Sequence, residues 1–325
     1  MCEVVMNKNM LLTFFALWAL PSLAFSQACC SAGVPLLGSL ELPTTSVGTW
    51  QFSLTYERNV LRDVISGTDK FDLNNRRRTV HSVLLETNYG LAQRVSITAL
   101  LSLIQQEREI TNPFLPGRTD FLSTRGSGDA VVLLKYDLYP LTMATQRQIA
   151  LGFGPKAPLG KSTIKTNGIL LPADLQPGSG AWDGILWGYL YQGFLPTTTA
   201  NLFGTLSYRY TGTNGRDYRF GNEFVATLGS SYRTNTIFDF SLSLRYRTVQ
   251  PEQFTGNDVP NTGGKWLSVL PGVNVKFAKN WALRFSGNLP VYRNLQGTQL
   301  TTTYRASVSL FYMIPKSSFL IPINK

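Results

Sequence analysis

The side chains able to do chemistry in this sequence are charged residues that alternate with apolar ones. Along 238–247, Phe238 and Phe240 take one parity, while Asp239, Arg245 and Arg247 take the other. Successive side chains of a strand point to opposite faces, so this pattern predicts one apolar and one polar face. In a soluble protein the polar face meets water. In an outer-membrane barrel it lines the lumen, and the apolar face meets lipid.

The same parity, extended along the chain, assigns a set of charged side chains to the interior of a closed sheet. These are Glu57, Glu86, Lys135, Asp137, Arg209, Glu223, Arg233, Asp239, Arg245, Arg247, Lys276, Arg284 and Arg305. Two interpretations remain open, namely ion-pair ladders that fill a small barrel and a constriction that selects solutes. For the second we single out Arg209, Arg245, Arg247, Arg305, Glu57, Glu86, Lys135 and Arg284. Strand direction places the first four towards the extracellular half, and rings of arginine favour anions.

The sequence gives little support for enzymatic, metal or cofactor chemistry. His81 is the only histidine and shares its parity with outward-facing Val83, whereas Ser82 points the other way. A serine–histidine phospholipase, as some outer-membrane barrels are, therefore lacks its pair. The sequence shows no metal cluster, phosphate loop or nucleotide motif, so we predict neither an enzyme nor a cofactor. A structural or adhesive barrel that acts through its loops stays open as an alternative.

Composition favours a membrane barrel. Charged residues make up 15% of the 325 residues and hydrophobic ones 43%. Beyond the N-terminal stretch, no apolar run approaches the 18 residues or so that a membrane helix requires. The net charge of +11 is spread along strands, which argues against a nucleic-acid partner.

The first 26 residues have a basic start, a short apolar core and the small residues Ala24 and Ser26 before Gln27, as a secretory signal does. Residues 1–5 resemble an upstream extension. We expect a periplasmic segment or plug over 27–48, a barrel over 49–314 and a periplasmic tail over 315–325. The adjacent Cys29 and Cys30 leave lipidation open as an alternative.

Alternation and turn residues predict about twelve antiparallel strands in an up-and-down barrel, with both termini periplasmic. The expected strands are 50–57, 80–89, 95–103, 129–139, 149–160, 187–191, 202–210, 223–233, 238–247, 267–277, 281–291 and 304–312. Long loops, including 111–126 and 161–180, alternate with mostly short turns. Aromatic residues at the short-turn ends predict an interfacial girdle of Trp50, Tyr89, Tyr139, Trp281 and Tyr312. Glu57 and Arg305, on the first and last strands, are expected to pair where the barrel closes.

Three short motifs resemble an outer-membrane barrel family described as putative transporters of the meta-pathway of phenol degradation. The matching residues are Gly126, Gly128, Asp129, Lys135 and Tyr136, then Pro158 and Gly160, then Gly178, Gly180 and Asp183. Leu159 departs from the family, which has threonine there. The resemblance implies a Gram-negative outer-membrane channel for small, aromatic or otherwise apolar solutes. Together with the basic interior, it predicts passive uptake through a narrow lumen, with lipid, the solute and the barrel-assembly machinery as partners.

Overall fold

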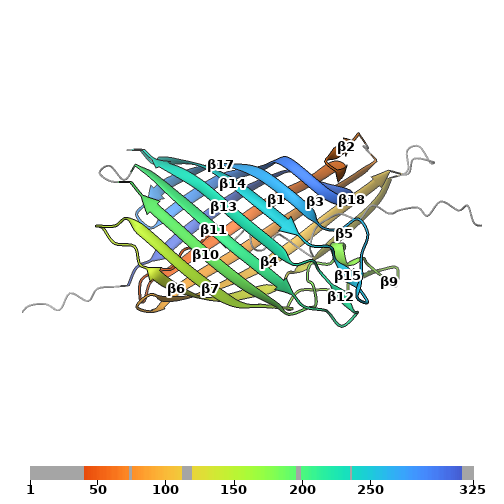
Figure 1. Cartoon of the computed structure of the whole chain (residues 1–325), viewed down its shortest axis with the longest axis horizontal. Helices are drawn as coiled ribbons and strands as arrows, with labels where there is room; N and C mark the ends of the chain where they lie inside the picture. The colour runs from red at the N-terminus through yellow and green to blue at the C-terminus, as the bar shows by residue number, and fades with distance from the viewer. Residues whose placement is uncertain (1–39, 73–74, 112–118, 195–198, 235, 317–325) are drawn as a thin grey trace, which may run out of the picture.

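The alternating stretches pair with their neighbours in chain order and close into an antiparallel barrel (Figure 1). The computed structural model describes residues 40–72, 75–111, 119–194, 199–234 and 236–316. The wall is built from β1 (Trp50–Gly67), β3 (Arg76–Ala92), β4 (Val95–Thr111), β6 (Ala130–Tyr139), β7 (Arg147–Ala157), β10 (Asp183–Gly193), β11 (Ala200–Thr211), β13 (Glu223–Arg233), β14 (Phe238–Val249), β17 (Gly264–Ala278) and β18 (Trp281–Ile314). Pairing of β18 with β1 closes the barrel, which confirms the predicted all-β barrel fold.

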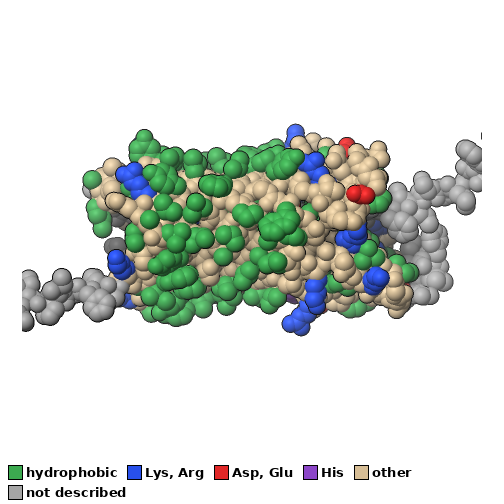
Figure 2. Space-filling model, turned by 90° about the horizontal axis from the view of Figure 1, so that it is seen from below, with side chains coloured by type: hydrophobic (Ala, Val, Ile, Leu, Met, Phe, Trp, Pro, Cys, Tyr) green, Lys and Arg blue, Asp and Glu red, His purple; other side chains and the backbone are tan. Residues whose placement is uncertain are grey.

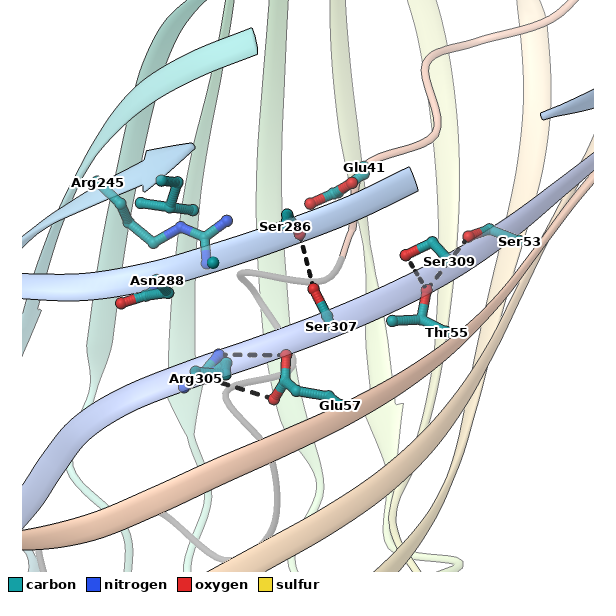
Figure 3. Close-up of a pocket in the computed structure, with 12 residues that line it drawn as sticks. Glu41, Ser53, Thr55, Glu57, Arg245, Ser286, Asn288, Arg305, Ser307 and Ser309 are labelled. Atoms are coloured by element: carbon teal, nitrogen blue, oxygen red, sulfur yellow. Dashed lines mark hydrogen bonds and ion pairs between the residues drawn. The ribbon is translucent and has the colours of Figure 1, made fainter. Parts of the chain in front are cut away.

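Strand β18 supplies two adjacent strands of the wall, because its chain reverses near Gly297, whose φ is 74°. Residues 281–295 pair with β17, and residues 298–314 pair with β1. The two halves run side by side in Figure 3, where the hydroxyls of Ser286 and Ser307 lie 2.7 Å apart. The described residues form eleven wall elements. Because β18 contains two strands, the wall has twelve strands within the described residues. This number agrees with the prediction.

The outer wall is apolar along its middle and charged towards its ends (Figure 2). On β14, Phe240 is 51% exposed and Leu244 is 52% exposed, whereas Asp239, which has the other parity, is 7% exposed. A continuous apolar surface of this extent is unfavourable in water. It is the surface that a barrel presents to lipid, with the polar parity turned inward.

One end of the barrel carries tight turns, and the structure places the predicted aromatic residues there. Trp50 packs on Tyr89 with ring centroids 4.4 Å apart, and Trp281 stacks on Tyr312 at 4.1 Å. Tyr139, also at this end, is 61% exposed. We call this the short-turn end.

The opposite, long-loop end carries the small elements, seen on the right in Figure 1. They are β2 (Asp69–Phe71), β5 (Thr119–Ser127), β8 (Lys165–Thr166), β9 (Ile169–Leu170), η2 (Ala173–Leu175), β12 (Tyr218–Arg219), β15 (Gln253–Phe254) and β16 (Asn257–Asp258). The predicted loop 111–126 is wrong in part, because β5 pairs with the upper half of β4. The wall strands run beyond the apolar band, and their extensions lose the alternation that marks a strand in the sequence.

Within the described residues, no helix is both long enough and apolar enough to cross a membrane. The expected signal segment 1–26, residues 27–39 and residues 317–325 of the expected tail lie outside the described residues.

Candidate functional site: a lumen occupied by residues 40–47

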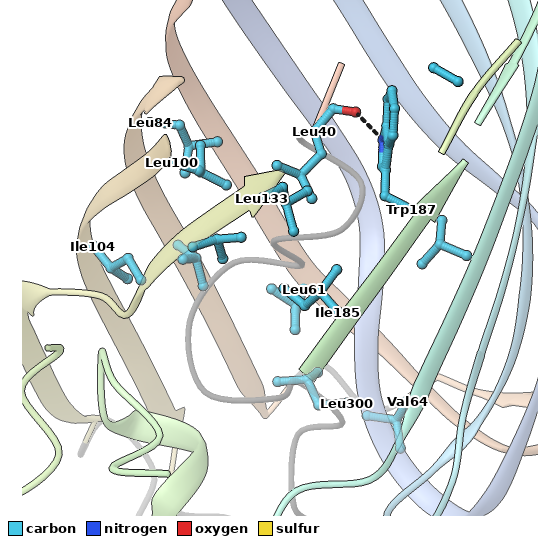
Figure 4. Packing of buried hydrophobic residues seen from close by; sticks show 14 residues of the cluster. Leu40, Leu61, Val64, Leu84, Leu100, Ile104, Leu133, Ile185, Trp187 and Leu300 are labelled. Carbon is cyan, nitrogen blue, oxygen red and sulfur yellow. Dashed lines mark hydrogen bonds between the residues drawn. The ribbon is translucent and has the colours of Figure 1, made fainter. Parts of the chain in front are cut away.

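The first described residues run inside the barrel. We call residues 40–47 the plug segment. The carbonyl of Leu40 accepts a hydrogen bond of 3.3 Å from the indole of Trp187, as Figure 4 shows. Leu40 is 2% exposed and belongs to a cluster of inward-facing apolar side chains that includes Leu61, Leu133 and Ile185. The interior is therefore apolar in part, although parity predicts a polar one.

Two charged residues hold the plug segment from the wall. Glu86 on β3 accepts the backbone N–H groups of Glu41 at 3.2 Å and of Leu42 at 3.3 Å. Lys135 on β6 donates to the carbonyl of Leu42 at 2.7 Å and lies 3.8 Å from the Glu86 carboxylate. Its ammonium also lies 4.1 Å from the ring centroid of Trp187. Both side chains are buried, and a buried ion pair persists only when such further bonds satisfy it.

Polar side chains hold the next residues of the plug segment. Asn88 donates to the carbonyl of Pro43 at 2.5 Å. Thr44 donates to the carboxylate of Asp137 and accepts from Gln148 at 2.6 Å. Asn88 lies two residues beyond Glu86 on β3, and Asp137 two beyond Lys135 on β6, so strand period brings all four side chains to one inner face.

Gly90 lets the plug segment enter the barrel. Val47 forms a parallel bridge with Gly90, and the N–H of Gly48 donates to the Gly90 carbonyl at 2.8 Å. A Cβ atom at Gly90 would overlap the carbonyl oxygen of Ser46. Only glycine allows the two backbones to approach this closely.

A cavity of about 330 Å³ lies between the plug segment and the inner faces of β10, β11, β13, β14, β17 and β18. Its wall combines aromatic rings, hydroxyls and arginines. The side chains that matter below are Tyr189, Tyr191, Phe203, Phe311, Arg233, Arg245, Arg284 and Glu41. The lining suits a small solute with an aromatic or apolar body and a polar group.

A smaller polar cleft of about 40 Å³ adjoins this cavity (Figure 3). Glu41, Arg245 and Ser286 line both spaces. In the cleft, Arg305 Nε lies 3.4 Å from Glu57, so the ion pair expected at barrel closure forms.

The four arginines proposed for the constriction fall into separate groups. Arg209 and Arg247 both bind Glu223, at 3.1 and 2.6 Å, and Arg247 also stacks on Trp266 at 4.7 Å. Arg245 donates to Thr227 at 3.2 Å, and Arg305 pairs with Glu57. Glu223 is fully buried, so this part of the lumen resembles the ion-pair ladder of the first interpretation. A role for these residues in selecting solutes stays a prediction.

The other charged residues assigned to the interior lie towards the short-turn end. Lys276 pairs with Asp239 at 2.7 Å, and Arg284 with Glu41 of the plug segment at 2.6 Å. Arg233 lines the cavity.

Most residues of the three motifs meet around a side chain that sequence reasoning missed, Lys156. Its ammonium contacts Asp129 at 2.5 Å, Asp183 at 3.2 Å and the hydroxyl of Ser179 at 2.5 Å. Asp129 also accepts the N–H groups of Gly160, at 3.2 Å, and of Ser179, at 3.0 Å. We call this group the Lys156 latch. It fastens both ends of the 158–181 loop to the wall.

The motif glycines allow this close packing. A Cβ at Gly160 would lie 2.6 Å from the Cα of Gly178, and one at Gly128 would overlap the hydroxyl of Ser102. Gly180 has a φ of 72°, which favours glycine. A Cβ at Gly126 would lie 2.9 Å from the side chain of Lys161. Two motif residues lie elsewhere, since Lys135 binds the plug segment and Tyr136 faces outward, 46% exposed. Pro158 comes directly after β7.

The 158–181 loop folds over the long-loop end. Arg78 on β3 binds the carboxylate of Asp174 at 3.0 Å, although Arg78 is only 1% exposed. Gln176 is fully buried and bonds with the backbone of Ile164 and Leu171. A neighbouring loop is held through Asn214, which donates to the carbonyl of Ser179 at 2.9 Å.

Sequence reasoning missed Lys156, Trp187 and the role of Glu41. Lys156 lies on the polar parity of its strand, so that signal could have identified it. Trp187 looks like an outward residue, but the outward parity of β10 is Leu186 and Leu190, which are 60% and 42% exposed. Both faces of that strand are apolar, so alternation cannot orient it.

The remaining candidate for catalysis lies on the outer wall. The Nδ1 of His81 is 2.7 Å from the hydroxyl of Tyr56, and Ser82 is buried on the opposite face. Among the described residues, no group of three or more His, Cys, Asp or Glu side chains could hold a metal ion.

Comparison with known proteins identifies the fold. No family model matches the sequence, and no curated protein matches it. Among solved structures, an outer membrane channel from Pseudomonas putida F1 superposes with a TM-score of 0.64 at 13% identity, covering 84% of this chain and 98% of that one. The chain has the fold of a Gram-negative outer-membrane β-barrel.

Two further structures are more distant. The β-domain of the Bordetella autotransporter BrkA gives a TM-score of 0.44 at 13% identity, covering 83% of this chain and 100% of that one. The toluene transporter TodX of P. putida gives 0.39 at 12% identity, covering 84% of this chain and 92% of that one.

Proposed function

We propose that this protein is an outer-membrane channel or transporter for passive uptake of small aromatic or otherwise apolar solutes, with the plug segment limiting the open lumen. The observation that carries the proposal is the cavity of about 330 Å³, whose aromatic and arginine lining lies beside the plug segment. A wide aqueous pore does not fit, because twelve-stranded barrels have little spare interior.

The same proposal implies an orientation of the barrel in the outer membrane. Short turns of outer-membrane barrels lie in the periplasm and long loops outside the cell. Both ends of the barrel sequence, Trp50 and Ile314, pair at the short-turn end. This pairing supports a periplasmic position of both termini as part of the proposal. The Lys156 latch and the 158–181 loop would then cover the outer mouth.

The test is conductance and solute flux of the purified chain in bilayers and liposomes. The variant with both Glu86→Gln and Lys135→Met loosens the plug segment while removing one negative and one positive charge. We expect the natural chain to show small, discrete conductance steps and the double variant to show larger ones. A natural chain and a double variant that are both silent, and neither of which raises the entry of cinnamate into liposomes above that of protein-free liposomes, would contradict a transport function.

A further inference from the structure

The Arg284–Glu41 ion pair lies where the plug segment borders the cavity. Arg284 Nη1 and Glu41 Oε2 are 2.6 Å apart, and the two side chains remain 33% and 41% exposed. Glu41 lines both the cavity and the polar cleft, so its carboxylate lies at the boundary between the two spaces. Figure 3 shows it extending from the plug segment towards the first half of β18.

The guanidinium of Arg284 is held in place independently of Glu41. Its Nε donates to Asn274 at 2.7 Å, and its plane lies over the ring of Phe311 at 5.0 Å from the centroid. A fixed, planar guanidinium is well suited to bind a carboxylate. The backbone N–H of Glu41 donates to the Glu86 carboxylate, and this bond does not involve the Glu41 side chain. The side chain can therefore leave Arg284 without moving the plug segment.

The cavity has more positive than negative groups. Arg233, Arg245 and Arg284 are among its lining residues, and Glu41 is the one carboxylate among the described lining residues. Removing Glu41 from Arg284 would leave the cavity with cations and aromatic rings. The complementary solute carries an anionic group on an aromatic or apolar body.

We infer that Arg284 is a carboxylate-binding site for aromatic carboxylates entering the cavity, and that Glu41 is its built-in, displaceable occupant. This inference rests on the proposed function, because it names the solute class of the same cavity. A partly exposed ion pair is weak, so a solute carboxylate can replace it. Movement of Glu41 also opens the boundary between the cavity and the polar cleft.

The test compares binding of cinnamate and of cinnamamide, which has the same ring but no charge, to the full chain in non-ionic detergent by calorimetry. Glu41→Gln removes the internal competitor, and we expect it to raise cinnamate affinity on the order of tenfold while leaving cinnamamide unchanged. Arg284→Gln should bring cinnamate affinity down to that of cinnamamide. Arg293→Gln is the control, because Arg293 binds Asp63 at 2.6 Å and does not line the cavity.

An unchanged cinnamate affinity in either Glu41→Gln or Arg284→Gln would overturn the site, as would the absence of cinnamate binding to every variant. Conductance measured on the same preparations separates this inference from the proposed function. Cinnamate binding that follows the expected order in a barrel without conductance or flux supports the site and contradicts transport. Conductance without a difference between cinnamate and cinnamamide overturns the site and supports transport.

Discussion

Individual buried charges in this barrel are held by several partners rather than by single ion pairs. Lys156 shows this most clearly, since its ammonium contacts two carboxylates, a hydroxyl and the carbonyl of Ala181 at 2.9 Å. Buried charges that lose one partner are costly, because the remaining charge has neither water nor a counter-ion.

We therefore predict that Lys156→Met destabilises the barrel by about 3–5 kcal/mol, since it leaves Asp129 buried without its cation and Asp183 with only Arg209, 3.9 Å away. Urea unfolding in detergent or lipid measures the change. Lys279→Met, at an exposed turn position, is the matched control and should change the unfolding free energy little. An equal effect of both substitutions would show that the Lys156 latch does not stabilise the fold.

A second residue-scale prediction concerns Glu252, in the loop after β14. Burial raises the pKa of Glu252 to about 7, against a hydrogen bond from Tyr218 that lowers it. The folded state thus binds more protons than the unfolded state between the two pKa values. Docking of this loop is most stable at low pH and weakens as pH rises from about 4.5 to 7.

Trypsin cleavage near Arg216 and Arg219 measures this effect. We expect the natural chain to be cut faster than Glu252→Gln at pH 8 and at a similar rate at pH 5, because the amide cannot ionise. Comparing the two chains at each pH removes the pH dependence of the protease. A ratio of rates that stays constant from pH 5 to pH 8 would count against the prediction.

At the scale of elements, the plug segment and the wall meet through backbone contact that only glycine permits. Gly90→Ala places a methyl group against Ser46, so we expect the entry of the plug segment to shift and the bilayer conductance to rise. Gly184→Ala is the control, because a Cβ there meets no atom within 4 Å. Equal conductance of the two variants would mean that the entry of the plug segment does not limit ion flow.

Strand positions were largely predictable, and strand ends were not. The hairpin of β13 and β14 matches its predicted range because lipid and lumen impose strict alternation there. The predicted strands 50–57 and 95–103 extend in the structure to Gly67 and Thr111. Beyond the apolar band the alternation stops, because β1 buries the apolar residues Val60, Leu61, Val64 and Ile65, whereas β4 continues with polar residues such as Gln106 and Glu107. The sequence therefore does not mark these strand ends.

At the scale of the whole molecule, the lumen contains a cavity whose described lining has three arginines and one carboxylate. We predict a mild anion preference of the conductance, because Arg233, Arg245 and Arg284 border the cavity and Glu41 is the one carboxylate among its described lining residues. The reversal potential under a KCl gradient measures it. A cation-selective reversal potential would contradict the prediction, and Arg245→Gln should reduce an anion preference.

The sequence by itself determined the barrel and its closure between the first and last strands, because both follow from a two-residue period that lipid enforces. Apart from the Glu57–Arg305 pair at barrel closure, only the tertiary structure decided which charges meet. Lys156 joins the motif residues Asp129 and Asp183, and Glu41 reaches Arg284 across 243 positions of sequence. Parity tells which face a side chain takes, but not its height along a tilted strand or its neighbour across the lumen. Those depend on strand register and on the path of the plug segment, which backbone contacts such as that at Gly90 set.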